Sequence, residues 1–458
     1  CDKVKMHFTK KDIKNKKITI IGLKKSGYSS AILAYSLGAK VFVSDCEDDN
    51  DTRDNYNKLI KKGIQCEIGK HSERIFNSNF WVISPGVPKG IDIIHKAEKL
   101  NIPIIGEIEF ASKFTNKPIV AVTGSNGKST TVNILFEMLK VGGYKPLLAG
   151  NIGKPFSKGV YELLNDLIEV DIIILEISSF QLEFIDQFRP YISLYLNITP
   201  DHLDRHNSME EYLRMKLKMI KNMKEDDFIV YNKDDKIINK SFEDTAPNKI
   251  SYSLKEKNKF FSLNSTKIYD ENLESFIAIK DIILKGNHNL SNLIASATVA
   301  KILNIKNKNI KSVMEQFTGI KHRLQFIRKL KEVTYINDSK ATNISSVIAA
   351  IKSFDNPIVL LLGGKNKDSD FRLLLPHTKR HVKHIVSFGE AGGEIATAIG
   401  DAVRLNIMSS LNQAVASAHK IASPGDIILM SPGCASFDEF NNFEDRGEKF
   451  IAMVNELN

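Results

Sequence analysis

One loop motif constrains this chain more than any other feature of its sequence. Residues 119–123 form a short apolar run, residues 124–130 read Gly-Ser-Asn-Gly-Lys-Ser-Thr, and an amphipathic stretch follows. This order predicts a strand, a phosphate-cradling loop and a helix, because backbone N–H groups at a helix N-terminus bind phosphate. Lys128 is expected to reach between the β- and γ-phosphates, and Ser129 to ligate Mg²⁺. The expected ATP-binding residues of the loop are Gly124, Ser125, Asn126, Gly127, Lys128, Ser129 and Thr130.

Apolar, β-branched runs alternate with helical stretches along the rest of the chain. This alternation is typical of βαβ units, which build parallel sheets. At 458 residues the chain is too long for one core, so roughly three domains are expected. We predict an α/β protein with a Rossmann-like N-terminal domain (1–114), a central P-loop ATPase-like domain (115–319) and a Rossmann-like C-terminal domain (320–458). Strands are expected at 17–22, 39–44, 80–84, 102–105, 119–123, 171–176, 194–198, 228–231, 357–362, 384–388 and 426–431.

Charge and composition narrow the functional classes. The net charge of +10 comes from lysines spread along the whole chain, and no basic-aromatic nucleic-acid motif accompanies it. A solvated lysine-rich surface or an anionic small substrate explains the charge, and no nucleic-acid partner is expected. No apolar run approaches the roughly 18 residues of a membrane span. The four cysteines form no CxxC pair, which favours reduced thiols and gives no zinc site. We therefore expect a cytoplasmic protein, a monomer, without membrane insertion.

The N-terminal domain carries a degraded dinucleotide fingerprint. In Gly22-Leu23-Lys24-Lys25-Ser26-Gly27 the central glycine is replaced by Lys24, which disfavours NAD or FAD because that glycine lets the backbone approach a pyrophosphate. Asp45 stands where a ribose-binding carboxylate would end the second strand. A uridine nucleotide fits this pattern better, and a Rossmann-like domain without a ligand remains an alternative. The turn at Ser84-Pro85-Gly86 suits a phosphate, with a plain turn as the equal alternative.

Carboxylate and imidazole side chains follow two apolar runs of the central domain. Glu176 is expected at the end of a buried strand, where an acid beside a phosphate loop is a natural Mg²⁺ ligand. His202 lies between Asp201 and Asp204 in a Pro-marked loop, a position typical of binding residues. Lys216 falls in a predicted helix over 210–219. As an ammonium it cannot ligate a metal, and its spacing alone predicts no such role.

At this point the chain resembles the Mur ligases over essentially all of its length. The shared segments are 123–130, 176–183, 197–204, 286–289 and 322–323, and these would also match folylpolyglutamate synthetase-like relatives. The shortened loop Thr-Gly-x-x-Gly-Lys-Ser, with Val122 where the common loop has glycine, is that of ATP-dependent amide ligases. The most discriminating segments are 337–343, 363–371 and 431–438.

The resemblance implies an ATP-dependent ligase that joins D-glutamate to UDP-N-acetylmuramoyl-L-alanine through an acyl phosphate. It implies ATP and two Mg²⁺ sites, with Glu176 on the first metal and His202 with a carbamylated Lys216 on the second. The metal ligands are thus Ser129, Glu176, His202 and Lys216, and the catalytic residues are Lys128, His202 and Lys216. The adenine, phosphates and ribose would contact Asn289, Asn292, Arg323 and Asp338. The substrate-binding residues would be Ser26, Asp45, Ser84, Gly86, Asn151, Ser178, His202, Lys340, Thr342, Lys367, Ser436, Phe437 and Phe443.

Two alternatives remain open from the residues. A ligase adding glutamate to folate would have no need of a UDP-binding N-terminal domain, and the loop at 22–27 argues against it. A regulatory or transport ATPase would use water as acceptor and would lack an amino-acid site at 340–343. Lys365, in the loop before Lys367, is expected to be an ordinary surface lysine.

Overall fold

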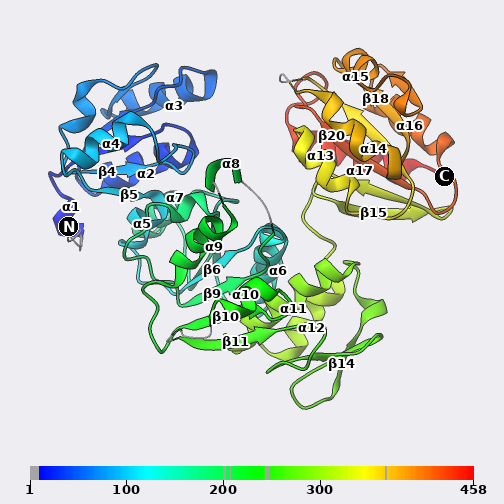
Figure 1. Ribbon diagram of the computed structural model, residues 1–458, viewed down its shortest axis with the longest axis horizontal. Helices are drawn as coiled ribbons and strands as arrows, with labels where there is room; N and C mark the ends of the chain where they lie inside the picture. Colours follow the sequence, from blue (N-terminus) through cyan, green and yellow to red (C-terminus); the bar gives the residue numbers. More distant parts are fainter. Residues whose placement is uncertain (1–9, 200–202, 207, 243–244, 246, 367–368) are drawn as a thin grey trace. The chain divides into compact units, whose positions relative to one another are not determined.

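The computed structural model describes residues 10–199, 203–206, 208–242, 245, 247–366 and 369–458 (Figure 1). Its contacts divide the chain into two compact units, Cys1–Phe317 and Thr318–Asn458. The first unit contains two parallel sheets and a small antiparallel one, and the second contains a single mixed sheet. No helix among these residues is long and apolar enough to cross a membrane.

The N-terminal sheet has five parallel strands in the order β3-β2-β1-β4-β5. Both faces are covered, so successive residues of one strand enter different cores: Phe80 and Val82 belong to one apolar cluster, Trp81 and Ile83 to another. The strands are β1 (Lys17–Ile21), β2 (Lys40–Ser44), β3 (Gln65–Glu67), β4 (Phe80–Ile83) and β5 (Ile104–Gly106). The helices are α1 (Lys10–Ile13), α2 (Lys25–Ser36), α3 (Asn50–Ile60), the 3₁₀ helix η1 (Glu73–Phe76), α4 (Asp92–Lys99) and α5 (Glu107–Ser112).

The central sheet has six parallel strands in the order β11-β10-β9-β6-β8-β7. Its strands are β6 (Ile119–Thr123), β7 (Pro146–Gly150), β8 (Ile172–Glu176), β9 (Ile192–Tyr195), β10 (Phe228–Asn232) and β11 (Asn248–Tyr252). The register pairs Val122 with Glu176 and Thr123 with Tyr195. Because the strands are parallel, the loops that follow β6, β8 and β9 all leave the same edge of the sheet.

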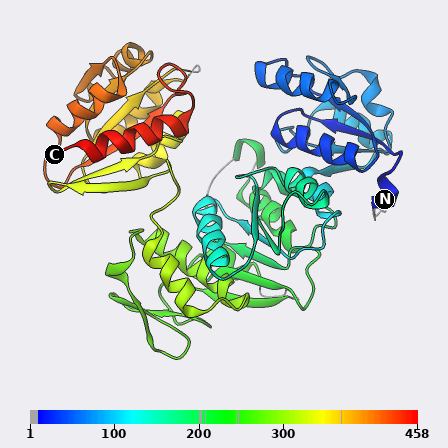
Figure 2. The same ribbon diagram turned by 180° about the vertical axis from the view of Figure 1, so that it is seen from behind.

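Helices cover the central sheet, with α11 and α12 packed against α6, and the small antiparallel sheet lies beside α12 (Figure 2). The small sheet holds β12 (Ser262–Leu263), β13 (Lys267–Tyr269) and β14 (Ser275–Ala278). The helices are α6 (Lys128–Val141), α7 (Phe156–Leu164), η2 (Phe180–Leu182), α8 (Leu203–His206), α9 (Met209–Leu217), η3 (Lys218–Ile220), α10 (Lys236–Lys240), η4 (Ile279–Asp281), α11 (Asn287–Ile302) and α12 (Asn307–Gln316).

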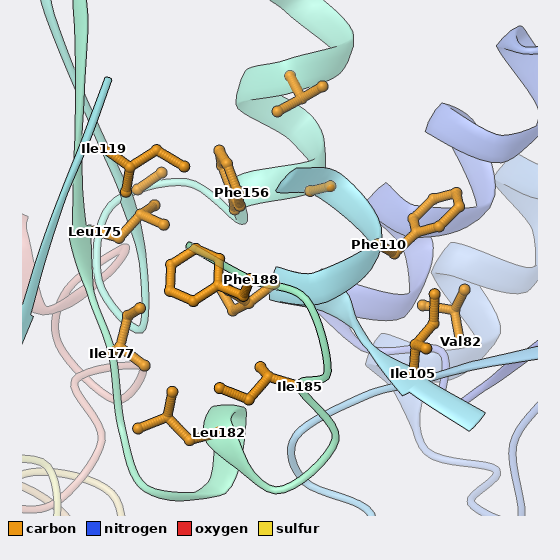
Figure 3. Packing of buried hydrophobic residues seen from close by; sticks show 14 of the residues in the cluster. Val82, Ile105, Phe110, Ile119, Phe156, Leu175, Ile177, Leu182, Ile185 and Phe188 are labelled. Carbon is orange, nitrogen blue, oxygen red and sulfur yellow. The ribbon is translucent and has the colours of Figure 1, made fainter. Parts of the chain in front are cut away.

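The two large sheets of the first unit share one apolar core. Val82 and Phe110 of the N-terminal part belong to the same buried cluster as Phe156 and Phe188 of the central part (Figure 3). A buried carboxylate reinforces the junction: Glu109 accepts hydrogen bonds from the backbone N–H groups of residues 186–188 and pairs with Lys113 at 2.7 Å. The N-terminal and central domains are therefore joined by buried apolar contact as well as by the chain.

The second unit has a six-stranded sheet in the order β15-β16-β20-β17-β18-β19, parallel except for β15. The strands are β15 (Gln325–Leu330), β16 (Val333–Asn337), β17 (Ile358–Gly363), β18 (Val382–Phe388), β19 (Leu405–Met408) and β20 (Ile427–Gly433). The helices are α13 (Ile344–Ile351), η5 (Phe371–Leu374), α14 (Leu375–His381), α15 (Gly392–Ile399), η6 (Gly400–Ala402), α16 (Leu411–Ile421) and α17 (Phe443–Glu456). The loops after β17 and β20 meet in an antiparallel bridge between Lys365 and Ala435.

The predicted three-domain α/β fold with parallel sheets is confirmed, and the strand limits differ in places. The strand expected at 194–198 occupies Ile192–Tyr195, so Asn197 and Ile198 lie in the loop beyond it. The strands β3, β7, β11, β15 and β19 and the small sheet β12–β14 were not expected from the sequence. The first five each lie at an edge of their sheet and have polar or Pro-containing sequences that lack a clear apolar run.

Candidate active site

The phosphate loop lies between β6 and α6 with two glycines in unusual backbone conformations. Gly127 has a φ of +83°, and a Cβ there would lie 2.5 Å from the side-chain oxygen of Asn292. Glycine is therefore required by conformation and by space. Lys128 folds back over the loop, where its Nζ donates to the carbonyl oxygens of Gly124 and Ser125, both at 2.8 Å. The predicted strand, loop and helix are all present.

Asn197, in the loop after β9, holds the phosphate loop in shape. Its side-chain oxygen accepts from the Asn126 N–H at 2.8 Å, and its Nδ2 donates to the Asn126 carbonyl at 3.0 Å. The Ser125 hydroxyl donates to the Thr199 carbonyl at 2.9 Å and lies 3.1 Å from the Tyr212 hydroxyl. The sequence assigned no role to Asn197 or Tyr212, although Asn197 opens one of the shared segments.

Helix α11 carries the two asparagines predicted to contact the nucleotide. Asn292 is buried and touches the position of Gly127. Ser296, one turn further along α11, donates to the Thr131 carbonyl at 3.0 Å and so fixes α11 against α6. Asn289 is half-buried and donates to the Lys285 carbonyl at 2.8 Å.

Glu176 has the character of a cation ligand. It ends β8, is only 1% exposed, and accepts a hydrogen bond from Asn151 Nδ2 at 2.8 Å through Oε1. Its other oxygen, Oε2, is buried without a hydrogen-bond partner among the described residues. A buried carboxylate oxygen is costly unless a cation or donor satisfies it. Ser129, in the first turn of α6, is buried too, and this donor set fits a hard cation.

Lys216 reaches the same loop from α9. Its side chain is buried, and its Nζ donates to the Gly124 carbonyl at 3.0 Å and to the Thr123 hydroxyl at 3.3 Å. The amine also lies 4.6 Å from the centre of the Tyr212 ring. His202 falls outside the described residues. Among those described, no three His, Cys, Asp or Glu side chains gather in a group that could hold a metal.

The N-terminal loop at 22–27 is organised by Asp45. Its carboxylate accepts from the Leu23 N–H at 2.6 Å and from the Glu47 N–H at 2.9 Å. The Ser84 hydroxyl donates to the Gly22 carbonyl at 3.3 Å, so the two predicted substrate turns touch. Lys24, which stands in place of the central glycine, points outward and pairs with Glu47 at 2.5 Å.

Three more of the predicted substrate residues belong to the first unit. Ser26 is half-buried in the first turn of α2, and Gly86 is exposed in the turn after β4. Ser178, after β8, is held by Gln181, whose side-chain oxygen accepts from the Ser178 N–H at 3.0 Å.

In the second unit Asp338 lies buried just after β16. Burial raises its pKa to about 6, although the Ser431 hydroxyl at 2.7 Å and the Leu324 N–H at 3.1 Å both donate to it. Asn337 of β16 pairs with Met430 of β20, so Asp338 and Ser431 follow directly after a paired position, which explains their meeting. Arg323, one residue before Leu324, has an exposed side chain.

Arg446 of α17 hydrogen-bonds to two loops whose residues were predicted to bind the amino-acid substrate. It is fully buried and donates to the Ser339 hydroxyl at 3.0 Å, to the Ser339 carbonyl at 2.9 Å and to the Cys434 carbonyl at 3.1 Å. Burial lowers the pKa of Arg446 to about 10. No motif signalled this role, because Arg446 lies in an ordinary amphipathic helix pattern.

The described residues that were predicted to bind D-glutamate lie in or near these two loops. The Lys340 side chain is exposed, with its Nζ 5.9 Å from the centre of the Phe443 ring. Ser436 is buried, Thr342 is half-buried and Phe437 is 63% exposed. Lys367 lies outside the described residues. Lys365 is exposed and pairs with Glu390 at 3.7 Å, in agreement with its interpretation as a surface lysine.

Three family models match successive parts of the chain. They describe a Mur ligase MurD-like N-terminal domain (residues 16–106), a Mur ligase middle domain (122–300) and a Mur ligase glutamate ligase domain (322–434). The UDP-N-acetylmuramoylalanine–D-glutamate ligase of Clostridioides difficile is 38% identical over 97% of this chain and 100% of its own length.

Solved structures share the fold at lower identity. The UDP-N-acetylmuramate–alanine ligase MurC of Thermotoga maritima is 16% identical, with a TM-score of 0.54 over 96% of this chain and 99% of that one. The MurF ligase of the same organism, solved in complex with ADP, is 15% identical, with a TM-score of 0.51 over 98% and 96%.

A phosphate-loop domain between two further α/β domains, with these three matches in order, defines an ATP-dependent ligase, and the chain belongs to the Mur ligase family. Within that family its full-length relatives are the UDP-N-acetylmuramoylalanine–D-glutamate ligases.

Proposed function

We propose that this chain adds D-glutamate to UDP-N-acetylmuramoyl-L-alanine at the expense of ATP, in peptidoglycan precursor synthesis. The observation that carries the proposal is the 38% identity with a D-glutamate ligase over the full length of both chains. The N-terminal match to a MurD-like domain and the glutamate ligase domain at 322–434 support the same substrates.

The reaction has two steps that need no side-chain nucleophile. The terminal carboxylate of the UDP-linked substrate attacks the γ-phosphorus of ATP, which gives an acyl phosphate and ADP. The amine of D-glutamate then attacks the acyl carbon, phosphate leaves, and the amine loses a proton as the amide forms. The N–H groups of the phosphate loop and Lys128 stabilise the charge of the transferring phosphoryl group.

Ser129 and Glu176 would hold Mg²⁺, because the buried Oε2 of Glu176 is without a partner among the described residues. When bound, Mg²⁺ withdraws charge from phosphoryl oxygens. We assign Lys216 to a second cation as a carbamate, together with His202. The buried Lys216 amine already reaches the Gly124 carbonyl, so a carboxylate built on it would face the phosphate loop.

The substrate residues are assigned from the resemblance to the Mur ligases. The UDP-linked substrate is assigned to Ser26, Asp45, Ser84, Gly86, Asn151, Ser178 and His202. D-Glutamate is assigned to Lys340, Thr342, Lys367, Ser436, Phe437 and Phe443, because two lysines match a desolvated dicarboxylate.

Phosphate release from ATP tests the function directly. The assay offers UDP-N-acetylmuramoyl-L-alanine with D-glutamate, L-glutamate or L-lysine in separate reactions. Turnover with D-glutamate alone is expected. Turnover with another amino acid would keep the ligase fold and reject the assignment of the second unit, and hydrolysis indifferent to every acceptor would favour a regulatory ATPase.

Carbamylation of Lys216 has its own test. Protein equilibrated with ¹³C-bicarbonate is expected to show a carbamate carbon signal that is absent from Lys216→Arg. An identical signal in both proteins would reject Lys216 as the modified residue.

A further inference from the structure

Arg205, in α8, joins loops of the N-terminal and central domains. Its Nε and Nη2 atoms donate to the two carboxylate oxygens of Glu183 at 3.0 and 2.8 Å. Nη2 also donates to the backbone carbonyl of Val87 at 3.1 Å. Glu183 is 5% exposed and the Arg205 side chain 19% exposed, so this fork is largely removed from water. Such a two-pronged, desolvated pair fixes both position and orientation.

Both partners of Arg205 belong to loops assigned to substrates. Val87 closes the turn that contains Ser84, and its N–H donates to the Ser84 carbonyl at 3.1 Å. Glu183 ends the segment that begins at Glu176, and its carbonyl accepts from Lys218 Nζ at 2.8 Å. One guanidinium therefore connects the turn beside the N-terminal loop with the segment that follows the cation ligand.

Two aromatic side chains next to Arg205 add further contacts to residues 179–183. The Arg205 guanidinium lies 4.3 Å from the centre of the Phe180 ring, and His206 stacks on that ring at 5.5 Å. His206 Nε2 lies 2.9 Å from the Ser179 hydroxyl. The position of α8 is thus coupled to residues 179–183 by polar and aromatic contacts.

We propose that Arg205 is a positioning residue that couples binding of the UDP-linked substrate at the Ser84–Val87 turn to the placement of the segment after Glu176. The inference rests on the proposed function for the identity of that substrate. A lysine has a single ammonium and cannot keep both prongs on Glu183 while donating to Val87. In Arg205→Lys, a substrate bound at the Ser84–Val87 turn would then be held less precisely relative to Glu176.

The test compares Arg205→Lys with Arg189→Lys. Arg189 makes a similar fork in the same unit, to Asp227 at 2.7 and 3.0 Å, at the opposite edge of the central sheet. For Arg205→Lys we expect the KM for UDP-N-acetylmuramoyl-L-alanine to rise about tenfold and the KM for D-glutamate to stay unchanged. Calorimetry without ATP is expected to show the same tenfold weakening of that ligand. Arg189→Lys is expected to match wild type.

A second variant, Glu183→Gln, removes the charge from the other side with little change of shape and is expected to reproduce the KM effect. Equal kinetics in Arg205→Lys and Arg189→Lys would overturn the coupling. A parallel loss for all substrates, accompanied by a lower melting temperature, would overturn it as well, because that pattern is purely structural. A wild-type protein that does not bind the UDP-linked substrate would instead overturn the proposed function, and the coupling with it.

Discussion

The N-terminal and central domains both contain a strand, a glycine-containing turn and a helix in succession, and the lysines of the two turns point in opposite directions. In the turn at 22–27, Lys24 points into solvent and pairs with Glu47, with 58% of its side chain exposed. In the turn at 124–128, Lys128 folds inward onto two loop carbonyls. The same supersecondary unit thus presents an outward cation in one domain and an inward one in the other.

The difference shows that the neighbouring strand decides what such a turn can bind. In the first domain the Asp45 carboxylate accepts from the Leu23 N–H, so an anionic side chain already occupies this donor. In the central domain the neutral amide of Asn197 supports the turn from the side. The second arrangement leaves the turn without a built-in anion among the described residues, which suits phosphate.

Replacing Lys128 should give the largest effect and the sharpest contrast. Lys128→Ala is expected to lower kcat about 10³-fold, or ~4 kcal/mol of barrier, because the cation at the transferring phosphoryl group is lost. Steady-state phosphate release measures it. The control is an unchanged circular dichroism spectrum. A decrease in kcat of less than about tenfold would contradict a catalytic role for the Lys128 ammonium.

Gly27→Ala tests the packing of the N-terminal turn. A Cβ at Gly27 would overlap the backbone carbonyl of Gly22, and backbone cannot move aside as a side chain can. We expect a loss of about 3 kcal/mol in the free energy of unfolding, measured by urea denaturation. Gly86→Ala, with no atom near its added Cβ, is the matched control. Equal stability of the two variants would show that the first turn is not close-packed.

Glu107, at the junction of the two domains, predicts a pH dependence. It is buried, its Oε1 accepts from the Ser157 N–H at 2.6 Å, and burial raises its pKa from 4.5 to about 7. The folded state therefore favours the protonated acid, and this contribution to stability is lost as the pH rises from 4.5 through 7.

Glu107→Gln should remove that dependence and be more stable than wild type at pH 8 by about 2 kcal/mol. Urea unfolding of both proteins at pH 5 and pH 8 measures the difference. An identical pH dependence in both would mean that Glu107 does not titrate in this range.

Lys24→Ala should give the smallest effect. An exposed ion pair contributes about 0–1 kcal/mol, so the free energy of unfolding is expected to fall by less than about 1 kcal/mol. The KM for the UDP-linked substrate is expected to change less than twofold. Thermal denaturation and steady-state kinetics measure the two quantities. A tenfold rise in KM would place Lys24 on the substrate and remove the contrast between the two turns.

The sequence predicted the elements that carry strong local signals. The glycines, Lys128 and Glu176 lie where the apolar runs and the loop motif placed them, because parallel strands bring their carboxyl ends to one edge. The sequence could not predict the supporting contacts. Asn197 and Arg446 act through partners far along the chain, and only the folded sheet brings those partners together.

The edge strands and the junction between the N-terminal and central domains could not be predicted from the sequence either. The segment 113–118 has the composition of a linker, yet Phe114 is buried in the shared core and Lys113 is paired with Glu109. In the sequence alone, polar residues that become buried in ion pairs cannot be distinguished from solvated loop residues.

The apolar core shared by the first two domains, shown in Figure 3, affects how the protein unfolds. Because Phe110 and Phe156 pack in one cluster, neither of the first two sheets can open without exposing apolar surface of the other. We therefore expect two cooperative units of unfolding, separated near residue 317, although the chain has three domains. Limited proteolysis should release an intact fragment containing both nucleotide-type sheets, and a truncation at residue 114 should leave an aggregation-prone remnant.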